Sequence, residues 1–233
     1  MPKIKLAICI SGHLTESNHI SDYQEMIVSI SKSFRDDRFE KYFFVSVDGD
    51  NQNLVCDYIS LVNPYDFTQF ENLQIPEFNL SIQNKRTETN VLNTYLMFWK
   101  IQLCDNLRVN YEKKNDIKFD FVMRTRPDLF FLKRLPKIIL ISLKLNLINY
   151  YMPYFPWRVN KYALADFFAF GKPEKMQYYS SVYENIHKYI NEGILFHPET
   201  LLGYHIKKKF RTSGYRTICR LSGSEIHLNG YRQ

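Results

Sequence analysis

Arginine and aspartate side chains stand at alternate positions in the segment Arg-Thr-Arg-Pro-Asp-Leu, which covers residues 124–129. The guanidinium groups of Arg124 and Arg126 have a planar fork of N–H donors that matches phosphate oxygens, and the carboxylate of Asp128 suits Mg²⁺ or Mn²⁺. The three side chains could therefore hold a diphosphate together with a divalent cation. A structural interpretation also stays open for each, because arginines form salt bridges and an aspartate can cap a turn.

The residues around this segment predict that it lies at the end of a buried strand. Residues 119–123 are mainly aromatic and apolar, which favours a strand in a core. Pro127 cannot donate to a strand ladder and restricts the residue before it, so the strand ends where the arginines stand. Side chains alternate along a strand, which places the two arginines on one side and Thr125 on the other. Ligands of α/β proteins bind beyond such strand ends.

Two more predicted strands end in residues that could contact a nucleotide or a cation. Ser11, Gly12 and His13 follow an apolar strand, and a glycine there lets the backbone approach a ligand closely. The sequence Asp-Gly-Asp at residues 48–50 follows the next strand. This pair of aspartates could bind a metal, or it could form an ordinary turn.

Three further side chains could act on phosphate or on an acceptor hydroxyl. Lys100 lies on the polar side of a long predicted helix, where it could reach phosphate or be an ordinary solvated lysine. Glu199 follows Pro198 in the first turn of a helix, a position that suits a general base or a routine first-turn acid. Asp166 precedes an apolar strand and could hold acceptor hydroxyls or act as the base instead, whereas His197 is interpreted as structural.

Alternating strands and helices must position these residues. Helical spacing of apolar residues predicts helices, and short apolar or aromatic runs predict strands. The expected strands cover residues 5–10, 42–47, 119–126, 146–152, 167–170 and 217–221. The expected helices cover residues 18–34, 54–62, 92–107 (with a cap at Thr89 or Asn90), 173–186 and 198–209. This order predicts an α/β protein with a mostly parallel sheet between layers of helices.

Composition and charge favour a globular chain with a basic end. The 233 residues, 45% of them hydrophobic, are enough for one large domain or two small ones. The net charge is +7, and most of it lies in residues 204–233, where seven basic residues face a single acid. This basic tail could contact anionic lipid, nucleic acid or a diphosphate, or Lys207, Lys208 and Lys209 could form a solvated helix face. Its aromatic residues are too scattered for a nucleic-acid stacking platform.

Cysteine usage and hydropathy predict a cytoplasmic protein, with any membrane contact peripheral. The four cysteines, at positions 9, 56, 104 and 219, have neither metal nor redox spacing, which favours a reducing compartment. No apolar run approaches the roughly 18 residues of a membrane span. The apolar run at the start is too short for a signal-peptide core.

Four segments, in the same order along the chain, resemble a known family of enzymes. Residues 124–129 carry the Arg-Thr-Arg-Pro-Asp-Leu signature of small nucleotide-sugar glycosyltransferases from lipopolysaccharide, capsule and viral glycan pathways. Residues 8–14 resemble the opening strand and nucleotide loop of that family, residues 166–171 its acceptor-side segment, and residues 197–202 its late helix start. The resemblance covers about residues 4–205 and implies a GT-A-like α/β fold with a Rossmann-like nucleotide-binding half.

The resemblance also implies an activity, which is transfer of a sugar from a nucleotide-diphosphate donor to a hydroxyl of a glycan acceptor. Residues 1–233 would form one domain, with a donor half up to about residue 131 and an acceptor half that ends in the basic tail. Asp128 would bind Mn²⁺ or Mg²⁺, and Glu199, ahead of Asp166, would be the catalytic base. The implied donor-binding residues are Ser11, Gly12, His13, Lys100, Arg124, Thr125 and Arg126.

The metal motif departs from the family pattern in one respect. Where the family usually has Asp-x-Asp, this chain has Arg126-Pro127-Asp128, so only the last carboxylate is present. Because the first carboxylate is missing, two interpretations other than an active glycosyltransferase stay open. One is a non-catalytic nucleotide- or glycan-binding module on a decayed transferase fold, and the other is a membrane-surface protein that binds through its basic tail.

Overall fold

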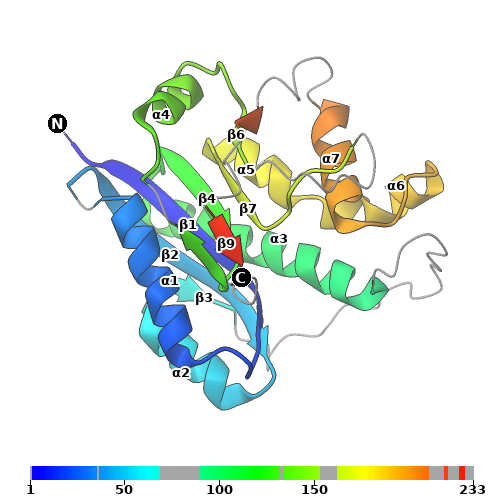
Figure 1. The fold of residues 1–233 in the computed structure, drawn as a ribbon. Coiled ribbons are helices and arrows are strands. Elements are labelled where there is room, and N and C mark those ends of the chain that lie inside the picture. Colours follow the sequence, from blue (N-terminus) through cyan, green and yellow to red (C-terminus); the bar gives the residue numbers. More distant parts are fainter. Residues whose placement is uncertain are drawn as a thin grey trace.

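A computed structural model describes residues 2–35, 37–68, 90–131, 134–152 and 162–209, together with the backbone of residues 218–219 and 226–228. Within these ranges the strands form two sheets (Figure 1). The larger sheet has seven strands in the order β3-β2-β1-β4-β7-β6-β8, and β5 pairs with β9 in the smaller one. The strands are β1 Ile4–Leu14, β2 Phe39–Gly49, β3 Asp66–Phe67, β4 Phe121–Thr125, β5 Leu129–Phe131, β6 Tyr150–Tyr151, β7 Phe168–Gly171, β8 Ile218–Cys219 and β9 Ile226–Leu228.

Parallel pairing dominates the large sheet. β3, β2, β1 and β4 run side by side in parallel, whereas β7 is antiparallel to both β4 and β6. β8 pairs in parallel with β6. Because β3, β2, β1 and β4 share one direction, their carboxyl ends meet at a single edge of the sheet. The predicted α/β architecture, a mostly parallel sheet flanked by helices, is confirmed.

Side chains of β1 alternate between two cores, one on each face of the sheet. Leu6, Ile8 and Ile10 belong to the first core, whereas Ala7 and Cys9 belong to the second. Helices on both faces cover these side chains (Figure 1). The first core contacts α1 Ile20–Ser33, α2 Gln52–Val62 and α4 Lys137–Lys144, and the second contacts α3 Val91–Asn115, α5 Pro173–Ser180, α6 Ile186–Asn191 and α7 Pro198–Lys209.

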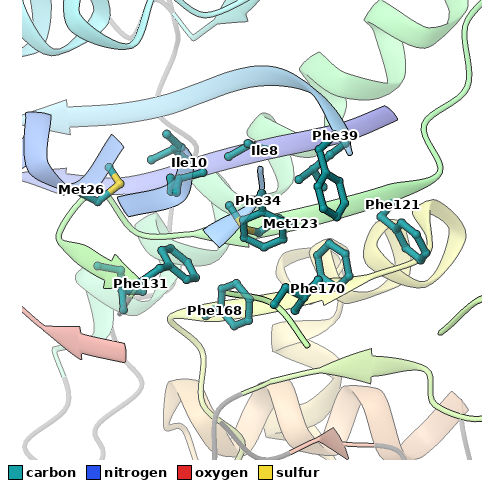
Figure 2. Packing of buried hydrophobic residues seen from close by; sticks show 14 of the residues in the cluster. Ile8, Ile10, Met26, Phe34, Phe39, Phe121, Met123, Phe131, Phe168 and Phe170 are labelled. Atoms are coloured by element: carbon teal, nitrogen blue, oxygen red, sulfur yellow. The ribbon is translucent and has the colours of Figure 1, made fainter. Parts of the chain in front are cut away.

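Aromatic rings fill the part of the first core that lies between β4, β5 and β7 (Figure 2). Phe121 stacks on Phe170 with 5.2 Å between ring centroids, and Phe131 meets Phe168 edge-on at 5.3 Å. Each such pair adds about 0.5–1.5 kcal/mol to what burial alone contributes. These contacts fix β4 against β7, and so they fix the start of the segment that carries the two arginines and Asp128.

Polar caps define both ends of the long helix α3. The side chain of Asn90 accepts a hydrogen bond from the backbone N–H of Asn93 at 3.0 Å, and Asp116 adopts a left-handed backbone with φ of 50° after the last turn. Of the two predicted cap residues, Thr89 and Asn90, the structure has Asn90, and the helix continues to Asn115, beyond the predicted end. Neither α3 nor any other helix in the described ranges is long and apolar enough to cross a membrane.

The structure differs from the predicted elements between residues 129 and 152. The strand expected over residues 146–152 is shortened to β6, because α4 occupies the preceding residues and Asn146 turns the chain with a left-handed φ of 56°. Neither α4 nor β9 was predicted. β9 pairs antiparallel with β5, so a segment near the end of the chain lies directly beside the strand that follows Asp128.

The helix predicted over residues 173–186 is interrupted. α5 ends at Ser180, where the hydroxyl of Ser181 donates to the backbone carbonyl of Tyr178 at 2.9 Å. A serine that bonds locally to the backbone in this way competes with continuation of the helix. The chain then forms a 3₁₀ turn over Tyr183–Asn185 before α6.

Candidate functional site

The carboxyl ends of β1, β2 and β4 bring most of the predicted site residues to one edge of the sheet. In the register of these strands Gly12 lies beside Val47, His13 beside Asp48, and Ile10 beside Thr125. The turn that contains Arg126, Pro127 and Asp128 directly follows β4. This edge is where α/β proteins bind their ligands.

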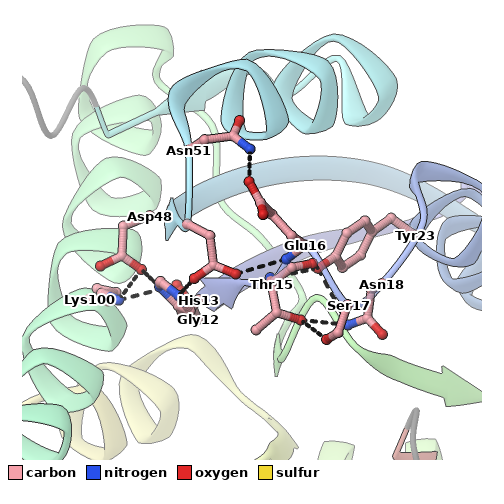
Figure 3. A network of polar contacts seen from close by, with 11 residues as sticks. Gly12, His13, Thr15, Glu16, Ser17, Asn18, Tyr23, Asp48, Asn51 and Lys100 are labelled. Carbon is pink, nitrogen blue, oxygen red and sulfur yellow. Dashed lines mark hydrogen bonds and ion pairs between the residues drawn. The ribbon is translucent and has the colours of Figure 1, made fainter.

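His13 connects two aspartates at the end of β2, of which Asp48 lies within the strand and Asp50 directly follows it. Figure 3 shows the contact between His13 and Asp48. Its Nδ1 lies 2.8 Å from Oδ1 of Asp48, and its Nε2 lies 3.0 Å from Oδ1 of Asp50. The other carboxylate oxygen of Asp50 accepts the backbone N–H of Glu16 at 2.8 Å. That backbone hydrogen bond, followed by the one from His13, lowers the pKa of Asp50. The Asp-Gly-Asp segment is therefore the end of β2, with both carboxylates hydrogen-bonded.

Lys100 reaches the same network from α3 (Figure 3). Its side chain is buried, forms an ion pair with Asp48, and donates to the backbone carbonyl of Gly12 at 3.3 Å. Burial lowers the pKa of Lys100, although the charge of Asp48 acts in the opposite direction. The interpretation of Lys100 as a solvated lysine is therefore wrong. Its ammonium group lies against the backbone carbonyl of Gly12, near the end of β1.

Close contact between Gly12 and Pro127 joins the end of β1 to the turn after β4. A Cβ atom on Gly12 would lie 2.7 Å from Cδ of Pro127, which is closer than real carbon contacts allow. Only a glycine fits this position without a shift of the proline ring. The network around His13 and the Arg126–Asp128 turn are consequently parts of one surface.

Arg124 is buried and holds the segment that precedes β7. Its Nη1 donates to the backbone carbonyl of Asp166, which also accepts the hydroxyl of Tyr179 at 3.3 Å. Within the described residues the Nε–H of Arg124 has no acceptor. Burial lowers the pKa of this guanidinium, opposed by the Tyr179 hydroxyl and the charge of Asp166. Arg124 thus has the carbonyl of Asp166 as a structural partner, and its Nε–H remains a buried donor without an acceptor in the described part of the chain.

Arg126 and Asp128 face each other across Pro127. Nε of Arg126 donates to one oxygen of Asp128 at 2.8 Å, and Nη2 donates to the other at 2.6 Å. Both carboxylate oxygens are therefore engaged by the guanidinium fork. Among the residues that the structure describes, no group of three or more His, Cys, Asp or Glu side chains could hold a metal ion. Protein ligands alone would give a cation at Asp128 a single carboxylate, and substrate phosphates and water would have to supply the others.

Glu199 lies in the first turn of α7, where burial makes it an unusual acid. Its side chain is 7% exposed, and Oε2 has no hydrogen-bond partner among the described residues. Burial, and to a smaller extent the nearby charge of Asp166, raises the pKa of Glu199 to about 8. A carboxyl group with this pKa is a stronger base than an ordinary glutamate once it has lost its proton.

A close backbone approach explains why Asp166 lies near Glu199. A Cβ atom on Gly203 would collide with the backbone carbonyl of Tyr162 at 1.5 Å, so only glycine permits this packing. The backbone N–H of Leu164 then donates to the carbonyl of Glu199 at 3.1 Å. These contacts hold residues 162–166 against α7. The charge of Asp166 acts on the pKa of Glu199, of Arg124 and of Arg126, which connects the two halves of the site.

Two of the predicted donor-binding residues point into the protein. Ser11 is 1% exposed, and its hydroxyl has no partner among the described residues. Thr125 is fully buried, and its hydroxyl donates to the carbonyl of Arg126 at 3.3 Å. Contact between either residue and a ligand would have to come from the backbone.

Two residues that the sequence analysis did not assign to the site, Tyr179 and His197, also lie near Asp166. Tyr179 supports Asp166, and the sequence pattern had placed it only on the apolar face of a helix. His197 has an Nδ1 without a partner in the described part of the chain, and burial lowers its pKa. A cavity of about 460 Å³ opens beside Asp48, between the end of β2, α2 and β3, with Gln52 and Phe67 in its lining.

Comparison with known proteins supports the fold. No protein family and no curated protein matches the sequence. Among solved structures, an active-site mutant of LgtC, a glycosyltransferase with the GT-A fold, is similar with a TM-score of 0.50 over 93% of this chain and 72% of that chain. The two sequences are 10% identical, so the likeness concerns the fold alone. The chain has a GT-A-like α/β fold.

Proposed function

We propose that the chain is a nucleotide-sugar-dependent glycosyltransferase, which transfers a sugar from a nucleotide-diphosphate donor to a hydroxyl of a glycan acceptor. The observation that carries this proposal is the placement of three cationic side chains at the carboxyl edge of a glycosyltransferase fold. Lys100, Arg124 and Arg126 come from a helix, a strand and a turn, and they converge with Gly12 at this edge. Such an arrangement suits a nucleoside-diphosphate leaving group, which gains a further negative charge as its bond to the sugar breaks.

On the donor side, the proposal assigns charge stabilisation to the protein cations. The transition state places negative charge on the leaving diphosphate, and preorganised donors in a partly dry site stabilise that charge strongly. Arg124 has an unused Nε–H, and Arg126 can exchange its ion pair with Asp128 for phosphate oxygens. The cavity beside Asp48 offers space for the nucleobase, with Phe67 as an apolar wall.

A divalent cation remains part of the proposal, with Asp128 as its protein ligand. Mn²⁺ or Mg²⁺ at this carboxylate would neutralise the diphosphate, and the phosphate oxygens and water would complete its coordination. Asp128 is the only acid of the Arg-Thr-Arg-Pro-Asp-Leu segment, so the protein cations must provide the remaining positive charge.

On the acceptor side, Glu199 is proposed as the base that removes the proton of the acceptor hydroxyl. Its unpartnered Oε2 and its raised pKa, about 8, suit proton abstraction. Asp166 is proposed to tune Glu199 through its charge and to hold acceptor hydroxyls. An exchange of these two roles is the alternative to be tested.

A thermal-shift panel tests the donor proposal. The full chain would be heated with UDP-, GDP-, ADP- and dTDP-linked sugars, each with and without Mn²⁺, because a ligand that binds the folded state raises the melting temperature. The same donors would then be assayed for transfer and for slow hydrolysis. Stabilisation by one donor together with its hydrolysis supports the proposal, whereas a bound nucleotide found only at the basic tail contradicts it.

A second candidate function is a non-catalytic module that binds a nucleotide or a glycan. The closed ion pair between Arg126 and Asp128 favours it, because in this state neither side chain is available to a substrate. Stabilisation by a donor without any hydrolysis or transfer would select this alternative.

The proposal also includes the two substrates and the cellular location of the reaction. The donor and acceptor partners are a nucleotide sugar and a surface polysaccharide, lipopolysaccharide or glycoprotein glycan, with no specific nucleic acid. A cytoplasmic location, with peripheral contact at an anionic membrane, follows from the cysteine and charge patterns.

A further inference from the structure

The outer side of α4 and the turn after it expose large aliphatic side chains. α4 buries Ile139, Leu140 and Leu143 in the first core, so its opposite side faces solvent. The side chains on that opposite side are Ile138 (61% exposed), Ile141 (50%), Leu145 (64%) and Leu147 (64%). The first three follow the spacing of a single helical stripe. We call these four side chains, with the basic residues Arg134, Lys137 and Lys144 around them, the α4 face.

Charge around the α4 face has one sign. Between Asp128 and Asp166 the sequence contains no acidic residue, although it contains six basic ones. Three of the six, Arg134, Lys137 and Lys144, are exposed in or next to α4. The backbone carbonyl of Lys144 also accepts the ammonium group of Lys172 at 3.3 Å, which brings a further cation to the end of the helix.

The α4 face is remote from the candidate site. The backbone N–H of Leu135 donates to the carbonyl of Ser33 at 3.3 Å, so the start of α4 lies at the carboxyl end of α1, near the beginning of β2. Figure 1 shows α4 at one end of the sheet and α2 at the other. The residues of β2 from Phe39 to Asp48 separate these ends by roughly 30 Å. The apolar stripe therefore does not belong to the donor or acceptor site.

We propose that the α4 face docks the protein on the surface of an anionic lipid bilayer. A helix that lies in the membrane interface inserts aliphatic side chains between the headgroups and keeps cations beside them for anionic lipid, and the α4 face has both features. Four aliphatic side chains supply well under the roughly 800 Å² per partner of a stable protein interface, which makes a second protein the less suitable occupant. The basic tail, by contrast, is basic without a comparable apolar stripe in its sequence.

Vesicle flotation tests the proposal with the full chain. The vesicles would be an equimolar mixture of phosphatidylglycerol and phosphatidylcholine, compared with phosphatidylcholine alone. The wild-type chain is expected to float with the anionic vesicles only. The double variant Ile138→Ser/Ile141→Ser should lose at least about tenfold in partitioning, and Lys137→Ser/Lys144→Ser should lose a similar amount at low salt.

Matched controls separate a specific face from general effects of charge and hydrophobicity. Ile20→Ser/Val28→Ser removes two exposed aliphatic side chains from α1, and Lys113→Ser/Lys114→Ser removes two exposed cations from the end of α3. Both control variants should float like the wild type. Thermal unfolding of all variants confirms that the exposed substitutions leave the fold intact.

Three outcomes would overturn the proposal. The first is flotation of the α4 variants at wild-type levels. The second is loss of flotation on Lys207→Ser/Lys209→Ser with no effect of the α4 variants, which would transfer the contact to the basic tail. The third is a wild-type chain that forms a dimer and does not bind vesicles, with dissociation of the dimer in Ile138→Ser/Ile141→Ser. That result would make the occupant of the α4 face a second copy of the chain. Because nucleotide-sugar thermal shifts do not depend on this face, failure here leaves the proposed transferase activity to its own test.

Discussion

Replacement of Glu199 by glutamine should make the protein more stable and much less active at neutral pH. The substitution keeps the size of the side chain and removes its charge. In the unfolded chain the carboxyl ionises near its ordinary value of 4.5, whereas in the folded protein its pKa is about 8. At pH 7 the folded wild type therefore retains a proton that the unfolded chain has lost.

The sign and the size of the stability effect follow from this difference in pKa. A raised pKa of an acid stabilises the folded state fully below pH 4.5, and that contribution is lost as the pH rises through the folded pKa. The loss is about 1.4 kcal/mol for each pH unit between the two values, which accumulates to about 3 kcal/mol at pH 7. Glu199→Gln does not titrate, so it should gain this amount relative to the wild type between pH 4.5 and pH 7.

Urea unfolding at several pH values between 5 and 8 measures the effect. Glu174→Gln is a matched control, because Glu174 is also a first-turn acid that directly follows a proline, but it is exposed. The free energy of unfolding of Glu199→Gln should fall less steeply with pH than that of the wild type, and Glu174→Gln should follow the wild type. Equal slopes for all three proteins would refute the reasoning that burial holds the proton on Glu199.

Transfer kinetics of the same variant test the proposed base. Transfer by Glu199→Gln should fall by about 10² or more, with little change in donor affinity, because a general base contributes on that scale. In the wild type the transfer rate should rise with pH until about 8, where Glu199 becomes ionised. If Glu199→Gln keeps near-normal turnover and Asp166→Asn does not, the base must be assigned to Asp166.

Three further substitutions probe the donor side. Asp128→Ala should abolish transfer and cost at most about 1 kcal/mol of stability, because its ion pair with Arg126 is partly exposed; wild-type rates in this variant, or full wild-type activity in excess chelator, would remove the metal from the proposal. Gly12→Ala should lower the free energy of unfolding by about 1–3 kcal/mol, because its Cβ would overlap Pro127, and an unchanged urea midpoint would contradict this. Lys100→Met should weaken nucleoside diphosphate binding about tenfold or more in calorimetry, since it removes a buried cation, and equal affinity would show that Lys100 has only a structural role.

Local sequence signals were sufficient for the elements that position the site. The continuous apolar run at residues 6–10 of β1 reflects burial on both faces of the sheet, and the aromatic segment before Arg124 is buried as β4. Asn90 caps α3 as its side-chain type suggests. Pro127 ends the strand, and this local rule placed the arginines and Asp128 at a strand end.

Interactions between distant parts of the chain explain what the sequence did not reveal. Lys100 occupies a polar position of a helix, yet it is buried because Asp48, 52 residues away, provides a partner. The packing of residues 162–166 depends on the missing side chain of Gly203, which no periodicity indicates. α4 is apolar on both sides, so its pattern could not distinguish a helix from a buried strand.

The pairing of β5 with β9 has a consequence for how the protein is made. β5 directly follows Asp128, and its partner lies at residues 226–228. A ribosome that adds about 5–20 residues per second needs roughly 5–20 s to travel between these two strands. During that time β1, β2 and β4 can already pair, while the outer edge of β5 stays open beside the arginine turn. An unpaired strand edge is a template for contact with other chains, so nascent chains are most exposed to aggregation at the site that the mature protein would use for its donor.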